Sequence, residues 1–262
     1  MSTNTSSILV VGGHDPSGAG IQADIETIVI NKCHAISVLT CITAQNTSSV
    51  NFVKPIYRDD FKTKINTILE EFKPKVIKIG LIPNFELCEE INHFIKAINY
   101  KIEIIVDPII RAGSGSDLIE ETQSAGLKKF LLAETTLLTP NRFELFDLTQ
   151  TDNFMASLEY LFMSGVKNIL ATDLIDDQYT ITSALASKDN DQITYFSHPR
   201  ISGKFHGSGC TLASAIACGL AKNKNLNRSV LEAIHFTNRA IGYAYELGAA
   251  QRIPNRSIEL LR

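Results

Sequence analysis

The sequence ILVVGGHDPSGAG, at residues 8–20, joins an apolar, β-branched run to a glycine-rich loop. The run at 8–12 is typical of a buried strand, and the residues from about 19 to 30 predict a helix directly after the loop. A strand, a short loop and a helix in this order open a βαβ unit, in which the next strand lies parallel to the first. This stretch therefore predicts an α/β fold.

The same alternation continues along the chain. Further strands are expected at 37–43, 75–80, 103–107, 136–139 and 168–172. Helices are expected at 61–72, 85–98, 123–132, 141–148, 155–163, 209–222 and 226–247. The segments 179–186 and 192–196 resemble a hairpin, which indicates antiparallel strands at one edge of a mostly parallel sheet. Ligands bind such sheets beyond the carboxyl ends of the strands, so function is sought in the loops that follow them.

Length and composition fit one domain over residues 1–262, with loosely held ends at 1–7 and about 255–262. The 25 basic and 28 acidic residues give a net charge of −3, which argues against nucleic-acid or membrane-surface binding. Five cysteines without C-x-x-C spacing favour a reducing compartment over disulfides or zinc. The polar N-terminus lacks the pattern of a signal peptide, and no stretch has the roughly 18 apolar residues of a membrane span. We therefore expect a cytoplasmic protein.

The glycine-rich loop at 12–20 fits two interpretations. Glycines let the backbone approach a ligand closely, and the N-terminus of the helix that follows favours an anion or a polar ring. The same glycines also suit a purely structural turn between strand and helix. The spacing matches neither G-x-x-x-x-G-K-[ST] nor G-x-G-x-x-G, which excludes those two nucleotide-binding motifs.

A second glycine-rich turn, HGSGCTL at 206–212, opens an apolar helix. Successive N–H groups at Gly207, Ser208 and Gly209 can form a concave anion site, and the positive end of the helix dipole lies behind it. Cys210 falls in the first helical turn, where the pKa of a thiol is expected to be lowered. The turn is suited to a transferring phosphoryl group; a tight-packing turn around a small buried cysteine is the alternative. A nucleophile elbow is excluded because His206 stands where that motif needs glycine.

The segment TPNRFE at 139–144 also permits two interpretations. Asn141 and Glu144 have the spacing of a helix capping box. They can equally face a magnesium ion, which needs few carboxylates and keeps its waters, with Asp107 sharing that task. After another strand, the side-chain amide of Gln45 offers one donor and one acceptor to the edge of a heterocycle, unless it only belongs to a turn. The histidines His34, His93 and His198 show no metal-ligand spacing and are expected at the surface or satisfied by neighbours.

Taken together, five segments resemble hydroxymethylpyrimidine/phosphomethylpyrimidine kinases of thiamine biosynthesis, which belong to the ribokinase-like superfamily. The segments are GGHDPSGAGIQAD (12–24), AQNT (44–47), VDP (106–108), TPNRFE (139–144) and HGSGCT (206–211). The resemblance runs from about residue 8 to residue 255. It implies a three-layer α/β/α fold without the β lid of sugar kinases, because the first strand leads into a helix within a few residues.

The resemblance also implies an activity: two successive ATP-dependent phosphorylations of 4-amino-5-hydroxymethyl-2-methylpyrimidine, with Mg²⁺. The pyrimidine would be bound by Gln45, with Gly12, Ala19 and His206 on the substrate side. Asn141, Glu144 and Thr172 would serve the nucleotide, and Asp107 and Glu144 the metal. Gly207, Ser208 and Gly209 would form the anion hole, and Cys210 would accept the proton of the hydroxymethyl group. A homo-oligomer, a dimer, is expected as for many enzymes.

The sequence departs from the family pattern at a position that is expected to lie near the nucleotide phosphates. Members often carry Val-Lys-Gly-Gly-His after a late strand, with the lysine near the nucleotide phosphates, whereas this chain has ATDLI at 171–175 and an acidic Asp173. Three alternatives therefore stay open: a kinase for pyridoxal or another hydroxymethyl heterocycle, a ligand-binding homologue without activity, and a hydrolase using Cys210 and His206.

Overall fold

The computed structural model describes residues 5–110 and 122–261. Within them a nine-stranded sheet has the order β3-β2-β1-β4-β5-β6-β7-β8-β9. Its strands are β1 (Ser7–His14), β2 (His34–Gln45), β3 (Val50–Pro55), β4 (Val76–Ile79), β5 (Glu103–Val106), β6 (Leu137–Leu138), β7 (Asn168–Asp176), β8 (Thr180–Ser187) and β9 (Asn190–Pro199). The six central strands, in the order β2-β1-β4-β5-β6-β7, pair in parallel. At one edge β3 pairs antiparallel with β2, and at the other β8 pairs antiparallel with β7 and β9. The predicted α/β class with antiparallel edge strands is confirmed.

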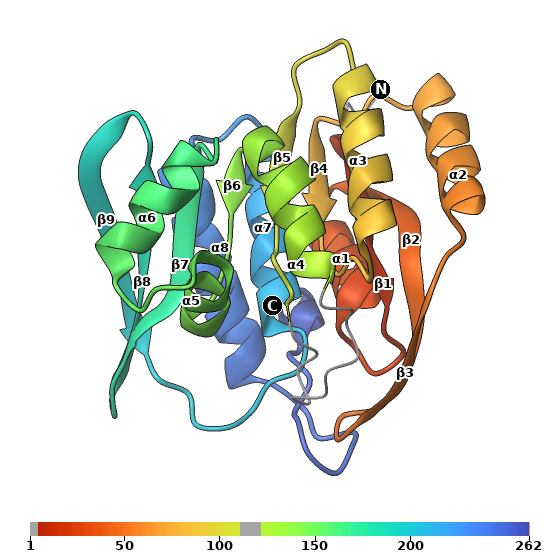
Figure 1. The fold of residues 1–262 in the computed structure, drawn as a ribbon. Coiled ribbons are helices and arrows are strands. Elements are labelled where there is room, and N and C mark those ends of the chain that lie inside the picture. Colours follow the sequence, from red (N-terminus) through yellow and green to blue (C-terminus); the bar gives the residue numbers. More distant parts are fainter. Residues whose placement is uncertain (1–4, 111–121, 262) are drawn as a thin grey trace.

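Helices cover both faces of this sheet (Figure 1). One face carries α2 (Arg58–Glu71), α3 (Phe85–Ala97), α4 (Thr122–Gly126), α5 (Arg142–Thr149) and α6 (Phe154–Met163). The other carries α1 (Gly20–Ile30), α7 (Ser208–Ala221) and α8 (Leu226–Gly242). A π turn (Leu127–Leu131) and a 3₁₀ turn (Leu132–Glu134) continue from α4, and a 3₁₀ helix (Arg256–Leu261) ends the described chain.

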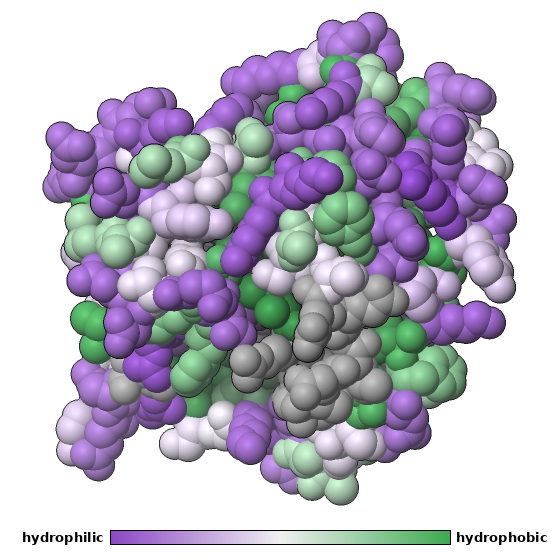
Figure 2. Space-filling view, in the orientation of Figure 1, coloured by the Kyte–Doolittle hydropathy of each residue, from purple (hydrophilic) through white to green (hydrophobic). Residues whose placement is uncertain are grey.

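Two apolar cores separate the three layers, and the pleat of the strands explains both. Successive side chains of a strand point to opposite faces. In β1, Leu9 and Val11 belong to the core under α2 and α3, whereas Ile8 and Val10 belong to the core under α1 and α7. A run of consecutive apolar residues is therefore required in the central strands, since both faces are buried. The outward face of the helices in front is mostly hydrophilic (Figure 2).

The structure corrects several expected boundaries. The hairpin between β2 and β3 was not expected, because 50–55 mixes polar and apolar residues at a sheet edge. The last long helix ends at Gly242 and not at residue 247, since Tyr245 instead pairs with Ile253. Residues 15–19 alone separate β1 from α1, so no lid is inserted there.

The sequence suggested loosely held ends at 1–7 and about 255–262; residues 1–4 and 262 lie outside the described part of the chain, and the other residues of these ends make the following contacts. Ser7 already belongs to β1, and the Ser6 hydroxyl donates to the carbonyl of Ala221. At the other end Arg256 and Ile258 are buried. Among the described helices, none is long and apolar enough to cross a membrane.

Candidate active site

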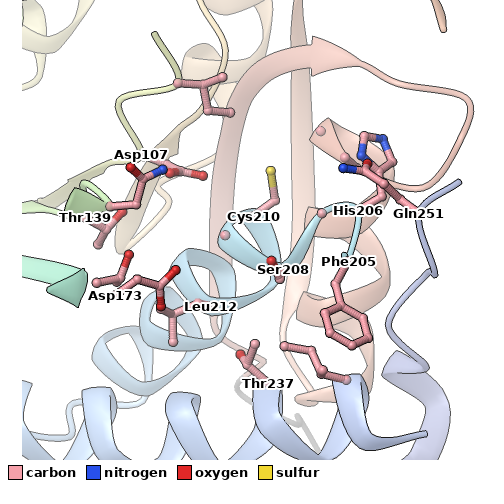
Figure 3. Close-up of a pocket in the computed structure, with 18 of the residues that line it drawn as sticks. Asp107, Thr139, Asp173, Phe205, His206, Ser208, Cys210, Leu212, Thr237 and Gln251 are labelled. Atoms are coloured by element: carbon pink, nitrogen blue, oxygen red, sulfur yellow. The ribbon is translucent and has the colours of Figure 1, made fainter. Parts of the chain in front are cut away.

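A pocket of about 470 Å³ opens beyond the carboxyl ends of the central strands and faces the N-terminus of α7 (Figure 3). It is lined by nearly every residue that the sequence singled out: Ala19, Gln45, Asp107, Asn141, Glu144, Thr172, His206, Gly207, Ser208, Gly209 and Cys210. The exception is Gly12, which is buried in β1, where a Cβ would meet Ile21 and Gly80. Gly13 and His14 line the pocket in its place.

The turn before α7 contains Gly207, which has a left-handed backbone conformation with φ of +80°. A side chain there would be strained and would also meet the Gly18 carbonyl and the Arg256 guanidinium at 2.7 Å. α7 begins at the next residue, Ser208, so the first N–H groups of the helix lack intrahelical partners and border the pocket. This geometry suits an anion, as the sequence predicted.

Cys210 lies in this first turn, between Asp107 on one side of the pocket and His206 on the other (Figure 3). Its side chain is 5% exposed, and burial raises the pKa of the thiol to about 12. The nearby Lys78 lowers that pKa, but Asp107 and Asp24 raise it further. The expected lowering of the thiol pKa is therefore wrong, because burial and two carboxylates outweigh the charge of Lys78 and a hydrogen bond from the Gly20 backbone.

A buried ion cluster beneath the turn was not foreseen. Lys78, in the middle of β4, is fully buried, and its ammonium lies 2.9 Å from Asp24 of α1 and 3.8 Å from Asp107 after β5. Ser214 of α7 donates to the Asp24 carboxylate at 2.7 Å. The cluster thus connects α1, β4, β5 and α7 directly below Cys210. The only signal in the sequence was a lysine inside an otherwise apolar strand, VIKI.

The glycine-rich loop contacts the anion turn through a hydrogen-bonded network. His206 Nε2 lies 2.6 Å from Asp15 Oδ2, and Ser17 donates to Asp15 through its N–H and its hydroxyl. Burial raises the pKa of Asp15, but the hydrogen bonds from His206 and Ser17 outweigh it, so the net pKa is lowered. An ionised Asp15 accepts only, and His206 therefore carries its proton on Nε2. The amide of Gln45 lies 3.4 Å from the same nitrogen, which places it beside the turn.

Asn141 and Glu144 form the capping box that their spacing allowed. Asn141 Oδ1 accepts from the N–H groups of Phe143 and Glu144, and Glu144 Oε2 accepts from the N–H of Asn141 at 2.9 Å. Both residues also line the pocket. The two interpretations of this segment are therefore compatible, since the cap fixes one carboxylate oxygen and leaves the group at the pocket wall.

The acidic residues of this wall fit a divalent cation. Burial and, next, the nearby Asp107 raise the pKa of Glu144 to about 8. Among the described residues the buried Asp107 Oδ2 has no hydrogen-bond partner. That part of the chain holds no group of three or more metal-binding side chains. Mg²⁺ needs only one or two carboxylates beside phosphates and water, so Asp107 and Glu144 match it.

The wall formed by β7 and β9 carries a charge pattern of its own. Asp173 has a left-handed backbone, with φ of 52°, and lines the pocket next to Thr172. The charges of His198 and Arg200 act on its carboxylate, and both residues line the pocket. His198 was expected at the surface or satisfied by neighbours; it is half-buried on the edge strand β9, and its Nδ1 lies 3.3 Å from the Pro199 carbonyl. Its place on an edge hairpin gave no local signal that it lines the pocket.

At the far end of the pocket, α8 contributes residues that the sequence did not indicate. Thr237 is buried, and its hydroxyl lacks a hydrogen-bond partner in the described part of the chain. Leu212, Ile234 and Ile241 provide an apolar lining around it. An apolar recess with one unpaired polar group is typical of a site for a flat organic ring.

Comparisons with known proteins agree with this geometry. The family described as phosphomethylpyrimidine kinase matches residues 15–255. A hydroxymethylpyrimidine/phosphomethylpyrimidine kinase of Bacillus subtilis is 29% identical over 250 residues, covering 92% of this chain and 91% of the relative. Pyridoxal kinase from Staphylococcus aureus in complex with ADP has the same fold, with a TM-score of 0.86 at 22% identity over 97% of this chain and 94% of that one. Phosphomethylpyrimidine kinase from Clostridium difficile superposes with a TM-score of 0.78 at 28% identity, covering 90% of this chain and 100% of that one. The resemblance carried by the sequence motifs is confirmed, and the chain belongs to the phosphomethylpyrimidine kinase family.

Proposed function

We propose that this chain transfers the γ-phosphoryl group of ATP to 4-amino-5-hydroxymethyl-2-methylpyrimidine and then to the resulting monophosphate. The observation that carries the proposal is one pocket whose lining includes two groups of residues. Gln45 lies beside His206 of the anion turn, and Asn141, next to Glu144 in the capping box, pairs with Thr172. A ring bound at Gln45 and a nucleotide bound along β7 would meet at the N-terminus of α7. Family membership supports the same reaction.

The pocket residues divide into tasks that follow from their chemistry. The Gln45 amide can pair with an aminopyrimidine edge through one donor and one acceptor. The N–H groups of Gly207 to Gly209 face the position at which negative charge develops on the transferred phosphoryl group. Mg²⁺, when bound, neutralises phosphate charge, and Asp107 and Glu144 are its proposed ligands. The apolar recess around Thr237 is the proposed site of the adenine ring.

Phosphoryl transfer requires that the hydroxymethyl oxygen bonds to phosphorus as the bond to ADP breaks, and that the hydroxyl proton leaves. We propose Cys210 as the acceptor of that proton. A neutral thiol cannot accept a proton, so Cys210 must first lose its own. That proton leaves to solvent before the transfer, and the nearby Lys78 ammonium favours the thiolate that remains.

The test is product analysis by mass. Purified protein is incubated with Mg-ATP and either the hydroxymethylpyrimidine or its monophosphate, and we expect the mono- and diphosphate respectively. Phosphorylation of pyridoxal but not of the pyrimidine would assign the activity to the pyridoxal alternative. Binding of Mg-ATP without transfer to either ring would contradict the enzyme and favour a binding homologue. Hydrolysis of esters in the absence of ATP would favour the hydrolase.

Two further expectations accompany this function. All five cysteines are buried free thiols, which supports the proposed cytoplasmic location. The expected dimer stays a prediction, which sedimentation of the purified protein would test.

A further inference from the structure

Arg256, in the last helical turn of the described chain, reaches into the interior beside the anion turn. Its side chain is only 2% exposed. Nη2 donates to the Gly18 carbonyl at 2.7 Å and lies 3.4 Å from the Gly207 carbonyl. Nε donates to the Thr211 hydroxyl at 2.8 Å, and Nη1 pairs with Glu26 at 2.9 Å. One side chain thus contacts the glycine-rich loop, the anion turn, α7 and α1.

The two segments that Arg256 joins each contain a glycine with a positive φ angle whose carbonyl group Arg256 contacts. Gly18 and Gly207 have φ of +108° and +80°, conformations in which the chain turns sharply. The Thr211 hydroxyl, which accepts from Arg256, itself donates to the Gly207 carbonyl at 2.7 Å. The Gly207 carbonyl is therefore fixed from two directions. Since the planar guanidinium has donors in a rigid fork, it sets the distance between the Gly18 and Gly207 carbonyls more strictly than a single donor can.

A second connection between the same segments lies at the neighbouring residues. His206 lies within hydrogen-bond distance of Asp15 and Ser17, so the loop at 12–20 and the turn at 206–210 are joined there as well. The His206 contact lies at the pocket wall, whereas Arg256 contacts the segments from the buried side. Removal of Arg256 leaves the first contact in place and lets the turn pivot about it.

Burial of the charged Arg256 guanidinium also has an unfavourable desolvation free energy. Its partner Glu26 is 42% exposed, and the other acceptors are neutral oxygens. A buried guanidinium with only one partly solvated counter-ion is not an efficient way to stabilise a fold. The position instead adds positive potential directly behind the N–H groups that face the pocket.

We propose that Arg256 is a positioning residue that holds the glycine-rich loop against the anion turn, so that the N–H groups of 207–210 and the Cys210 thiol keep their alignment for phosphoryl transfer. The proposal rests on the kinase function proposed above. Because Arg256 touches neither the ring at Gln45 nor the nucleotide wall at Thr172, its loss is expected in kcat and not in KM. Misplacement of reacting groups by about 1 Å can lower rates by roughly 100-fold.

The experiment compares Arg256→Ala, Arg256→Lys and the matched control Glu26→Gln, which removes the exposed ion pair and keeps the three contacts to the loop and helix. We expect kcat to fall about 10-fold or more in Arg256→Ala, with both KM values changed less than about 2-fold. Arg256→Lys should keep part of the rate, and Glu26→Gln nearly all of it. Added methylguanidinium should restore part of the rate of Arg256→Ala, because the small cation can occupy the vacated site.

Hydrogen exchange of the same variants separates this proposal from the proposed reaction. In Arg256→Ala the amides of 17–20 and 206–211 should exchange faster, while those of β4 and β5 stay protected. This readout holds even if the wild-type protein transfers no phosphate, in which case the kinase function fails and positioning is still tested. Three results would each overturn the proposal. The first is an unchanged kcat per folded molecule in Arg256→Ala, and the second is unchanged hydrogen exchange at both segments. The third is a loss of kcat that methylguanidinium does not relieve and that Arg256→Lys shows in full.

Discussion

Replacement of Lys78 by methionine probes the buried ion cluster beneath the anion turn. Methionine fills a similar volume, so packing is nearly conserved and the positive charge alone is lost. Two carboxylates remain, Asp24 at 2.9 Å and Asp107 at 3.8 Å from the former ammonium. Their repulsion and burial are then uncompensated.

The expected cost follows from that geometry. Removing one partner of a buried ion pair destabilises proteins by about 3–5 kcal/mol, because the other charge stays buried without compensation. The free energy of unfolding is typically about 5–15 kcal/mol, so Lys78→Met should lose a large share of it. For a chain of this size the melting temperature should fall by about 6 °C or more.

Thermal and urea unfolding of the wild type and of the variants Lys78→Met, Asp24→Asn, Lys78→Met/Asp24→Asn and Lys62→Met measure the effect. The double variant Lys78→Met/Asp24→Asn removes the unpaired charge, while the amide oxygen introduced at position 24 can still accept from Ser214, and it should recover more than about 1.5 kcal/mol of the loss. Lys62→Met, on the exposed face of α2, serves as control and should change stability by less than about 0.5 kcal/mol. A loss below about 1 kcal/mol in Lys78→Met, or strict additivity in the double variant, would refute the reasoning.

Three further predictions concern the pocket. The pKa of Glu144 is raised by burial and Asp107 from 4.5 to about 8, so the ligand-free protein is stabilised by the proton on Glu144 at low pH and loses that contribution as pH rises through 8. Glu144→Gln stays neutral, and its melting temperature relative to wild type should rise between pH 5 and 8; a constant difference would contradict this. Asp173→Asn tolerates the same left-handed backbone and removes a negative charge beside the proposed phosphate path, so KM for ATP should fall several-fold in steady-state assays, whereas Asp189→Asn in the β8–β9 turn should not change it. Cys210→Ala should lower kcat far more than it weakens binding of the pyrimidine; an unchanged kcat would remove Cys210 from the reaction.

Much of the fold could be predicted because its signals are local. Apolar runs ended by glycine or proline mark the parallel strands, and amphipathic spacing marks the helices between them. The pocket followed largely from topology, since the motifs other than the turn at 206–211 stood at carboxyl ends of strands. The strand β3 escaped because an edge strand with polar residues has no clear apolar alternation.

The missed parts of the site depend on contacts between distant residues. Lys78 is separated by 54 residues from Asp24, and Arg256 by 238 from Gly18. Neither pairing leaves a pattern in the neighbouring sequence, and a segment after Pro254 resembles any chain end. The pKa of Cys210 was misjudged for the same reason. The helix start is visible in the sequence, whereas the burial of the thiol beside Asp24 and Asp107 is not.

The raised pKa values of Cys210, Asp107 and Glu144 have one origin, because each group is buried and lies near other carboxylates. The ligand-free pocket therefore disfavours negative charge, with the buried Lys78 as its close counter-charge. A nucleotide brings further negative charge, so we expect it to bind together with a cation that also offsets the charge of the carboxylates. We propose that Cys210 loses its proton only when nucleotide and cation are bound. On this reasoning the thiol contributes to the transfer step and little to binding of the ring, which is why its removal is expected to appear in kcat.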